Sequence, residues 1–311
     1  YTGGGCPHIL AEPQRTNSEI KSNEFSTWSI SSNVTPTADY IVSPDGTQNA
    51  TRLQFTGNGY RGNSTSSLVL RTVSCYAKRN DSGTQSVGFF INGSGVVDSS
   101  WSLTSDWVRF TYTFTPTSGS YIGIAGLSGA DISVFGFQLE EGSYATSYIP
   151  TSGSSVTRNQ DIFTRDGIGS LINSTEGVLF VEMAALSNPT SQETALCLSE
   201  GVAGTNRMLI RYKTNGNVGV VVRVANTTVA SIDFTVTSQL TFNKIALKYK
   251  ENDFALWVNG VEVGTDTSGV TFPSGTLNSI RFDQGNNSNF LFGKVKQLQV
   301  YDTALTDNQL I

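Results

Sequence analysis

The sequence predicts an all-β protein built from two tandem β-sandwiches of the jelly-roll type, and three observations carry this prediction. Nearly every apolar segment alternates with a period of two, as VRFTYTF does at residues 108–114. Clusters of Gly, Ser, Asn, Asp and Thr separate these short segments, which is typical of sandwiches and barrels. A chain of 311 residues exceeds one usual core, so we expect two domains.

The first half ends in a strand that is followed by a segment without apolar alternation. FGFQLE at residues 135–140 alternates, and we expect it to be the last strand of the first sandwich. The following exit peptide contains Tyr144, Tyr148 and Ile149. A solvated linker has little use for three large apolar groups, so we expect this peptide to be pinned against the first domain. Other strands are expected at residues 68–76, 108–114 and 121–125.

The second half shows clearer hairpins. Asn259-Gly260 lies between two apolar strands, and this pair accepts the positive φ angles of a two-residue type I′ turn. Thr306 is followed three residues later by Gln309, a capping box that predicts a single closing helical turn. We expect strands at residues 178–183, 207–212, 218–224, 244–250, 254–258, 261–263 and 291–301. The resulting domains are residues 1–150 with an N-terminal lead-in, a linker at 151–160, and residues 161–311.

Composition excludes several classes of function. Charged residues make up 14% and the net charge is −5, without the clustered basic face that nucleic acid requires. No apolar run approaches the length of about 18 residues that crosses a bilayer, so we expect no membrane insertion. Cys6, Cys75 and Cys197 are too few and too widely spaced for a disulfide framework or metal site. The chain begins without Met, and we expect it to be a piece of a longer protein.

Catalytic signals are weak, and we expect no enzymatic activity. Glycosidases use two carboxyl groups about 5 Å or more apart, whereas Glu182 is a lone acid on its predicted strand. His8 is the only histidine, which argues against a Ser-His-Asp site and against a His-rich metal centre.

Several motifs resemble known families. EPQRTN at residues 12–17, SPDGT at 43–47 and QLEEGSYATSYIPT at 138–151 resemble the carbohydrate-binding module of phage tail-fibre and other virion proteins. The layout is similar to jelly-roll modules of the family 4/9/22 group. FALWVNGVEVG at 254–264 and GKVKQLQVYDTALTDNQL at 293–310 resemble a concanavalin A-like lectin/glucanase domain of the laminin-G kind.

The resemblance implies a non-catalytic protein that recognises a polysaccharide or cell-surface glycan. It places the chain outside the cell, on a virion fibre or as a secreted protein, and homo-oligomers, trimers among them, are common for fibre proteins. Two alternatives stay open: a structural virion or filament part with lectin-like spacers, and accessory modules of a secreted polysaccharide-degrading enzyme. The resemblance also implies one structural Ca²⁺ per domain, with Asn23, Glu24 and Asp131 as ligands in the first. In the second domain Asp253, Asp283 and Asn286 are the alternatives.

Sugar sites combine aromatic faces with amides, carboxylates and Arg, and this chemistry selects the candidate binding residues. Tyr60 and Arg61 lie in the Gly-rich stretch TGNGYRGNSTS, which we expect to be an exposed loop. Trp28 and Trp107 are expected in the core. For Trp257, alternation separates Ala255 and Trp257 from Phe254, Leu256 and Val258, but leaves open which set faces inward. The candidate binding residues are Tyr60, Arg61, Tyr76, Trp101 and Trp257, with Tyr40 and Arg79 as further candidates.

Overall fold

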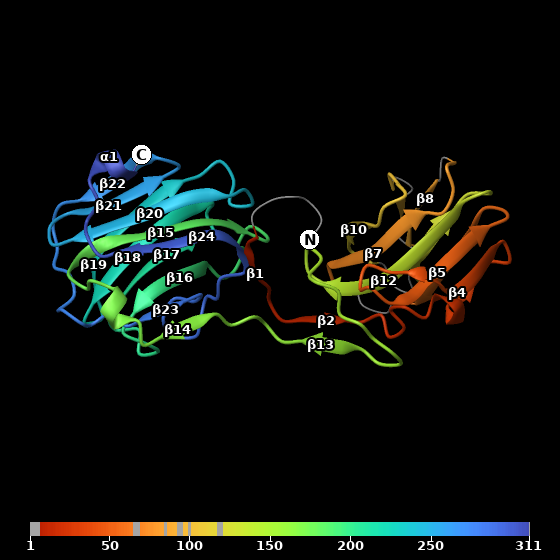
Figure 1. The fold of residues 1–311 in the computed structure, drawn as a ribbon, viewed down its shortest axis with the longest axis horizontal. Coiled ribbons are helices and arrows are strands. Elements are labelled where there is room, and N and C mark those ends of the chain that lie inside the picture. The colour runs from red at the N-terminus through yellow and green to blue at the C-terminus, as the bar shows by residue number, and fades with distance from the viewer. Residues whose placement is uncertain are drawn as a thin grey trace. The chain divides into compact units, whose positions relative to one another are not determined.

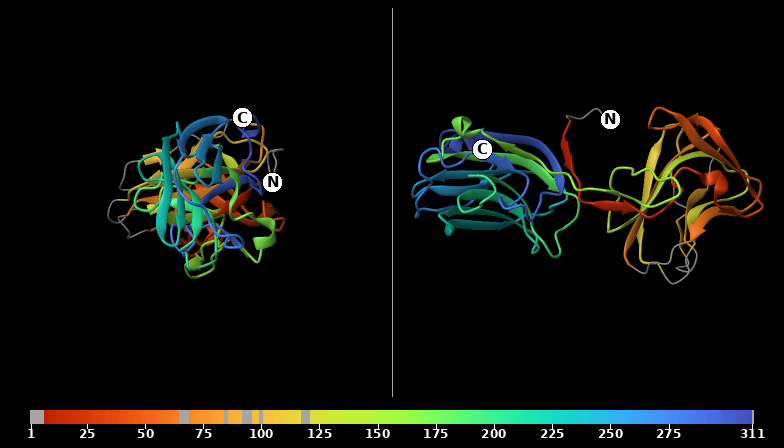
Figure 2. Two further views of the ribbon diagram at one scale, coloured as in Figure 1. Left: turned by 90° about the vertical axis from the view of Figure 1, so that its left-hand side faces the viewer. Right: turned by 90° about the horizontal axis from the view of Figure 1, so that it is seen from below.

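The computed structural model describes residues 7–64, 69–83, 86–91, 96–98, 101–116 and 121–310, and it confirms the all-β prediction of two sandwiches (Figures 1 and 2). One compact unit consists of Gln14–Asn159. The other combines the segment up to Pro13 with Gln160–Ile311. No helix in these described ranges is long and apolar enough to cross a membrane.

The first sandwich packs a five-stranded sheet against a second five-stranded sheet. The first sheet contains, in spatial order, β10 (Val108–Phe114), β7 (Arg71–Arg79), β12 (Asp131–Glu141), β5 (Gln48–Phe55) and β4 (Val34–Val42). The second contains β3 (Ser29–Ile30), β6 (Gly59–Ser64), β11 (Tyr121–Gly126), β8 (Val87–Ile91) and β9 (Val96–Asp98). Their inward residues form one core, in which Trp28 packs edge-on to Phe137 at 4.8 Å. A 3₁₀ turn, η1 (Phe25–Thr27), precedes β3.

The second sandwich has two six-stranded sheets. Sheet A, as we name it, orders β1 (Ile9–Ala11), β24 (Gly293–Tyr301), β15 (Glu176–Ala185), β20 (Asn243–Lys250), β21 (Phe254–Val258) and β22 (Val261–Asp266). Sheet B orders β14 (Thr164–Asp166), β23 (Ser279–Arg281), β16 (Thr194–Ser199), β17 (Arg207–Tyr212), β18 (Asn217–Val224) and β19 (Thr227–Thr235). A 3₁₀ turn, η2 (Gly169–Leu171), and the helical turn α1 (Asp307–Leu310) complete the unit.

The N-terminal strand changes the expected domain division. β1 pairs antiparallel with β24, with Ile9 opposite Val295, so it belongs to the second sandwich and not to the first. The first sandwich is therefore inserted into the second. Where the chain leaves and returns, the backbone N–H of Asp161 donates to the Glu12 carbonyl at 2.9 Å. β2 (Arg15–Asn17) then pairs with β13 (Val156–Arg158) in the same region of the chain.

The exit peptide after β12 is pinned to the first sandwich, as its apolar residues predict. Ile149 is 3% exposed, and its N–H donates to Gln138 Oε1 at 2.5 Å. The Tyr148 hydroxyl bonds to Ser22 Oγ at 2.7 Å, and burial raises the pKa of Tyr148 to about 12. Its ring lies against Gly136, whose φ of +64° and crowded Cβ position require glycine.

Local signals in the second sandwich are also confirmed. Asn259 and Gly260 have φ angles of 52° and 80°, as the turn between β21 and β22 requires. At the C-terminal turn, the Thr306 N–H donates to Gln309 Oε1 at 2.9 Å, which is one half of the predicted capping box before α1, while the Gln309 N–H donates to the Thr306 carbonyl.

Candidate functional site

The site that best combines shape with sugar-binding chemistry is a groove on the outer face of sheet A. It has a volume of about 530 Å³. We call it the sheet A groove. It is lined by Val178, Phe180, Glu182, Phe242, Lys244, Ala246, Trp257, Asn259, Gly260, Gln297, Gln299, Tyr301, Leu305, Gln309 and Leu310.

Strand register explains why these side chains gather. Paired residues of neighbouring strands share a face, so each row across the sheet presents one set of side chains. Phe180 of β15 stands opposite Gln299 of β24 and opposite Ala246 of β20, which in turn stands opposite Trp257 of β21. The groove thus has an apolar row across three strands, with Gln299 of β24 at its end.

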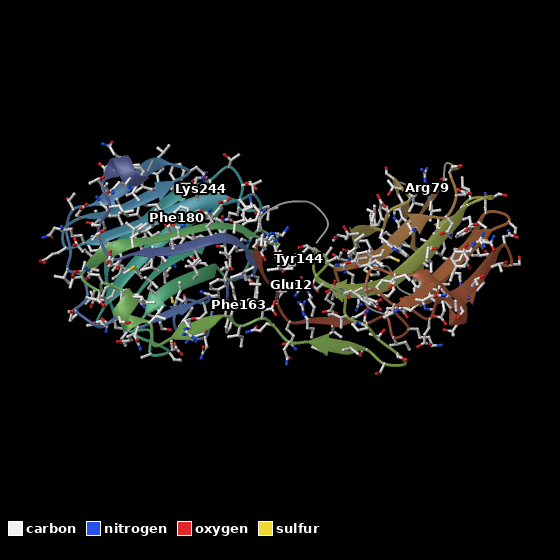
Figure 3. The ribbon with its side chains drawn as sticks, viewed as in Figure 1. Glu12, Arg79, Tyr144, Phe163, Phe180 and Lys244 are labelled. Atoms are coloured by element: carbon white, nitrogen blue, oxygen red, sulfur yellow. The ribbon has the colours of Figure 1, made fainter. Side chains whose placement is uncertain are left out.

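The next row along the sheet is polar. Glu182 stands opposite Gln297 on one side and Lys244 on the other. Phe180 and Lys244 can be located on β15 and β20 in Figure 3. The exposed side chains of this row therefore bring amide, carboxylate and ammonium groups next to the aromatic row.

Electrostatics in the groove are nearly balanced. Glu182 forms an ion pair with Lys296 at 3.4 Å. Lys296 also lies 3.8 Å from the centroid of the Phe242 ring, a cation–π contact that holds this ring at the groove wall. Since Glu182 is already paired, Lys244 adds one positive charge at the opposite side of the polar row.

Trp257 forms the floor of the groove. The core of the second sandwich contains Phe254, Leu256 and Val258, so Trp257 faces outward from sheet A, which settles the alternative that the sequence left open. It is nevertheless only 6% exposed. Leu305 and Leu310 of the C-terminal segment pack against its cluster and cover it. Its indole N–H is buried without a hydrogen-bond partner among the described residues.

Tyr60 is an exposed aromatic residue of the first sandwich, as predicted. It is 37% exposed and stacks on Phe90 with ring centroids 4.4 Å apart. A second, mostly apolar hollow of about 460 Å³ lies beside this pair, with Leu127 at its border. Residues 59–64 of the Gly-rich stretch form strand β6 and not the predicted loop, and the end of the stretch lies outside the described residues.

The prediction that Arg61 is an exposed sugar-binding residue is wrong, because Arg61 is part of the core and not of the surface. Alternation along β6 turns it to the side opposite Tyr60, and it is 2% exposed. Its guanidinium donates to the carbonyl oxygens of Phe25, Ser26 and Trp28 at 2.6, 2.7 and 3.0 Å. Burial lowers the pKa of Arg61. These three hydrogen bonds tie the guanidinium to the backbone of its own sandwich.

Trp101 and Trp107 both differ from their predicted positions. Trp101 is 5% exposed and stacks on Phe110 at 4.6 Å, so it is a core residue and not a sugar contact. Trp107, expected in the core, is half-buried instead. Its indole N–H donates to the Val42 carbonyl at 3.2 Å, and Lys78 Nζ lies 5.8 Å from its ring centroid.

Tyr76 lies on the outer face of the first sheet and is already engaged. The Arg109 guanidinium carbon is 5.3 Å from its ring centroid, and Phe135 packs 6.1 Å away. The two further candidates are similarly placed: Tyr40 is 39% exposed under Arg52, and Arg79 is half-buried.

The expected calcium ligands are not brought together. Asn23 donates to the Asn49 carbonyl at 2.7 Å, whereas Glu24 accepts from Ser152 at 3.0 Å. Asp131 forms an ion pair with Arg52. Burial raises the pKa of Asp131, but hydrogen bonds from Arg52 and Asn80 outweigh it and hold this pKa below its ordinary value.

In the second sandwich the alternative ligands are engaged as well. Asp253 pairs with Lys248 at 2.9 Å, and Asp283 pairs with Arg281 at 3.2 Å. Asn286 accepts from Ser288 at 2.7 Å. Within the described ranges, no group of three His, Cys, Asp or Glu side chains is arranged to hold a metal ion.

Sequence reasoning missed most of the sheet A groove. Gln297, Gln299 and Tyr301 were predicted only as part of a strand, although their alternation with Leu298 and Val300 carried the signal. Phe180 and Phe242 could be assigned to the groove only from the pairing of β15 with β20, which is a long-range property.

Comparisons with known proteins add a fold-level likeness. No curated protein matches the chain. Among solved structures, the CBM40 module of the Ruminococcus gnavus IT-sialidase is 19% identical with a TM-score of 0.37, and the match covers 44% of this chain and 81% of that one. The tandem CBM22 domains of Xyn10C from Paenibacillus barcinonensis are 12% identical with a TM-score of 0.32, covering 97% and 99%. A pentraxin from Limulus polyphemus is 13% identical with a TM-score of 0.33, covering 45% and 69%.

At these scores the structural likenesses carry no argument about a ligand. The sequence match is more specific and falls in the second sandwich, where the sheet A groove lies. Residues 183–310 match the family model of the concanavalin A-like lectin/glucanases superfamily.

Proposed function

We propose that this chain is a non-catalytic glycan-binding protein and that the sheet A groove holds the sugar. The observation that carries this proposal is the pair of adjacent rows in which Phe180 lies beside Gln299 and Glu182 beside Gln297. Aromatic faces stack on the C–H groups of a sugar ring, while amides and carboxylates bond its hydroxyls. A volume of about 530 Å³ lies in the range of small-ligand sites.

The carboxylate content of the groove supports binding without catalysis. Glycoside hydrolysis uses two carboxyl groups about 5–9.5 Å apart. Glu182 is the one carboxylate among the described residues that line the groove, and Lys296 neutralises it. His8, the chain's one histidine, lies edge-on to Phe242 at 6.0 Å.

The biological setting belongs to the same proposal. The resemblance of residues 12–17 and 138–151 to modules of phage tail fibres supports recognition of a cell-surface polysaccharide from a virion, or from a secreted protein. The structural alternative predicts that outer faces such as the Tyr60–Phe90 hollow are covered by copies of the chain, with more than about 1,000 Å² per contact.

A glycan array with the full chain tests the proposal, run with calcium and again with a chelator. The diagnostic variant is Gln297→Ala combined with Gln299→Ala, since both side chains are exposed and their loss should leave the fold intact. The matched control is Gln192→Ala, an exposed glutamine of the same sandwich outside the groove. Tyr60→Ala tests the first sandwich.

We expect selective binding that the double glutamine variant weakens by about tenfold or more, as loss of two hydrogen bonds implies. Gln192→Ala should bind like the parent chain. Equal weakening by the control, or loss only in Tyr60→Ala, would move the site out of the groove. A folded protein that binds nothing on a broad array would favour the structural alternative, and loss with chelator would show a role for Ca²⁺.

A further inference from the structure

Arg207 differs from the other buried arginines of this chain. The described residues include four arginines that are less than a tenth exposed: Arg61, Arg71, Arg207 and Arg281. Arg61 donates to three carbonyls, and Arg71 donates to Ser18 Oγ at 2.7 Å. Arg207 is 7% exposed, yet its guanidinium has no hydrogen bond or ion pair with any described residue. Buried polar groups are nearly always satisfied, so this exception requires an explanation.

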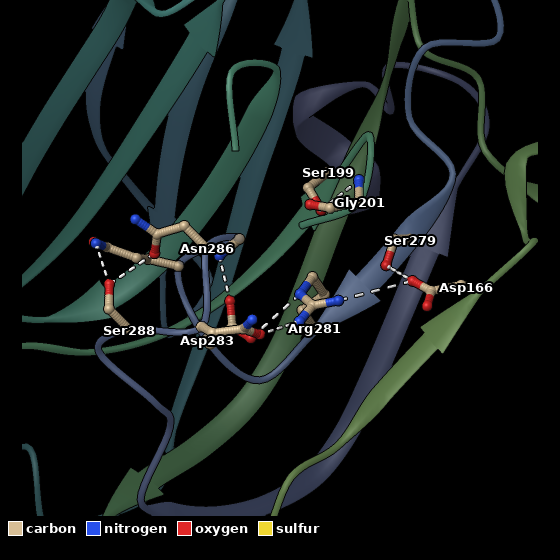
Figure 4. A network of polar contacts seen from close by, with 11 residues as sticks. Asp166, Ser199, Gly201, Ser279, Arg281, Asp283, Asn286 and Ser288 are labelled. Atoms are coloured by element: carbon tan, nitrogen blue, oxygen red, sulfur yellow. Dashed lines mark hydrogen bonds and ion pairs between the residues drawn. The ribbon is translucent and has the colours of Figure 1, made fainter. Parts of the chain in front are cut away.

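Arg281, on the same sheet, shows how a structural arginine is satisfied here. Its Nε donates to Asp283 Oδ2 at 3.2 Å, and a terminal nitrogen donates to Asn287 Oδ1 at 2.6 Å. The other terminal nitrogen lies 3.9 Å from Asp166 (Figure 4). Asp283 also accepts from the Gly285 N–H. This carboxylate is therefore committed to Arg281 and to the loop after β23, and does not pair with Arg207.

Two glycines flank the Arg207 side chain. Its stem runs beside Gly285 on the outer face of sheet B, and its Nη1 lies 2.7 Å from the position that a Cβ on Gly204 would occupy. Gly204 has a φ of +66°, so glycine is favoured there both by the backbone and by this guanidinium. The Nε of Arg207 is buried without a partner, and the side chain keeps a small exposure to solvent.

Positive charge accumulates at this point. Arg223 stands directly opposite Arg207 in the pairing of β17 with β18, and like charges in such pairs are destabilising. Arg211, on the same face of β17, is neutralised by Glu193 at 2.6 Å. Burial, and then the charge of Arg223, lower the pKa of Arg207. The nearby Asp283 carboxylate opposes this effect, but its hydrogen bonds go to Arg281 and Gly285, so neither Arg207 nor Arg223 has an ion pair with a described carboxylate.

We propose that Arg207, with Arg223 beside it, is an anion site on the outer face of sheet B that binds a carboxylate or sulfate group of an acidic polysaccharide. A guanidinium fork matches either oxyanion with two parallel hydrogen bonds. The anion site lies on the other sheet from the groove and stands on a different observation. Only the polymeric source of the anion rests on the proposed glycan-binding function.

Isothermal titration of the full chain tests the site with four probes. Polygalacturonate carries carboxylates, heparin carries sulfates, dextran is neutral, and sodium sulfate supplies the free ion. Arg207→Gln removes the guanidinium and its charge. Arg207→Lys keeps the charge without the two-pronged guanidinium, and serves as a second variant in case Arg207→Gln does not fold. Arg165→Gln makes the same charge change at an exposed residue of the same sandwich and is the matched control. The groove variant with Gln297→Ala and Gln299→Ala is titrated in parallel.

We expect binding of at least one acidic polymer, weakened by added salt, and none of dextran at the anion site. Arg207→Gln should weaken acidic-polymer binding by about tenfold or more, because it removes both the charge and the two-pronged hydrogen bonding. Arg207→Lys should weaken it by less, because the charge remains. Arg165→Gln and the groove variant should stay within about twofold. If the groove fails on the array while this pattern holds, the anion site stands alone.

Three results would overturn the proposal. One is an affinity of Arg207→Gln for acidic polymers equal to that of the parent chain. A second is equal weakening by Arg165→Gln, which would indicate a diffuse charge effect. The third is binding of free sulfate without either polymer, which would rule out a polysaccharide as the source of the anion.

Discussion

Replacing Arg281 and Arg207 separately by Met should have very different effects on stability, although both side chains are buried arginines of one sheet. Arg281→Met removes a guanidinium bonded to Asp283, Asn287 and Asp166, and leaves the Asp283 carboxylate, 1% exposed, without its cation. Breaking a buried pair in this way costs about 3–5 kcal/mol. For a sandwich of this size each kcal/mol shifts the melting temperature by about 2–4 °C, so we expect a fall of about 6–20 °C.

Arg207→Met removes no bond to a described residue and relieves the repulsion from Arg223. We therefore expect the melting temperature to rise or to stay within about 2 °C, as for a group kept for binding and not for folding.

Differential scanning calorimetry is the appropriate assay, because a two-domain chain need not unfold in one step. The transition of the first sandwich serves as an internal control and should not move in either variant. Arg165→Met controls for removal of an exposed charge. The reasoning would be refuted if Arg207→Met destabilised the second sandwich as much as Arg281→Met, or if Arg281→Met cost less than about 1 kcal/mol.

Three further predictions concern the first sandwich. Gly123→Ala should destabilise it by about 1–3 kcal/mol or more, since the new Cβ would lie 1.8 Å from the Arg61 carbonyl oxygen, and a urea melt of this transition measures the loss. Ile149→Ala should cost about 2–4 kcal/mol in the same melt, because this residue of the exit peptide is 3% exposed; an unchanged midpoint would show that the peptide is not pinned. The folded pKa of Asp131 lies below its ordinary value, so its contribution is present above the unfolded pKa of about 3.9 and is lost as the pH falls through the folded pKa. Asp131→Asn should abolish this part of the acid dependence of the melting temperature, and an identical acid profile would contradict the role of Arg52.

Local alternation predicted those features that depend on neighbours in sequence. VRFTYTF became β10 with the expected bounds, and Asn259-Gly260 became the expected turn. These signals succeed because side-chain direction in a strand and φ in a turn are set by a few adjacent residues.

The errors arose where a remote segment decides the outcome. The glycines around Arg61 suggested an exposed loop, but Gly62 lies where β6 closely approaches β11, and neither Gly62 nor Gly123 opposite it has room for a Cβ. The sequence left the direction of Trp257 open; it faces outward, but the C-terminal segment covers it. Neither the approach of two strands nor the covering of a tryptophan is encoded in the residues next to it.

Burial and hydrogen bonding together distinguish residues that the sequence presents as equivalent. Arg61, Arg207 and Arg281 all follow or occupy alternating strands and could each be assigned to a sugar site from residue type alone. Arg61 and Arg281 each donate several hydrogen bonds within their own sandwich, so their charges serve the fold. Arg207 has none in the described ranges, so its charge is the one left for a ligand.

The insertion of one sandwich into the other changes how the chain can fold. β1 must find β24 across almost the whole chain, and the entropy of closing a loop grows with its length. The first sandwich is formed by the continuous stretch Gln14–Asn159 and needs no strand from outside. Once it has folded, the pairing of β2 with β13 holds the outgoing and returning chain side by side, so the loop between β1 and β24 is shortened by the whole inserted stretch. β1 can then cover the edge of β24, which would otherwise be free to pair with another chain.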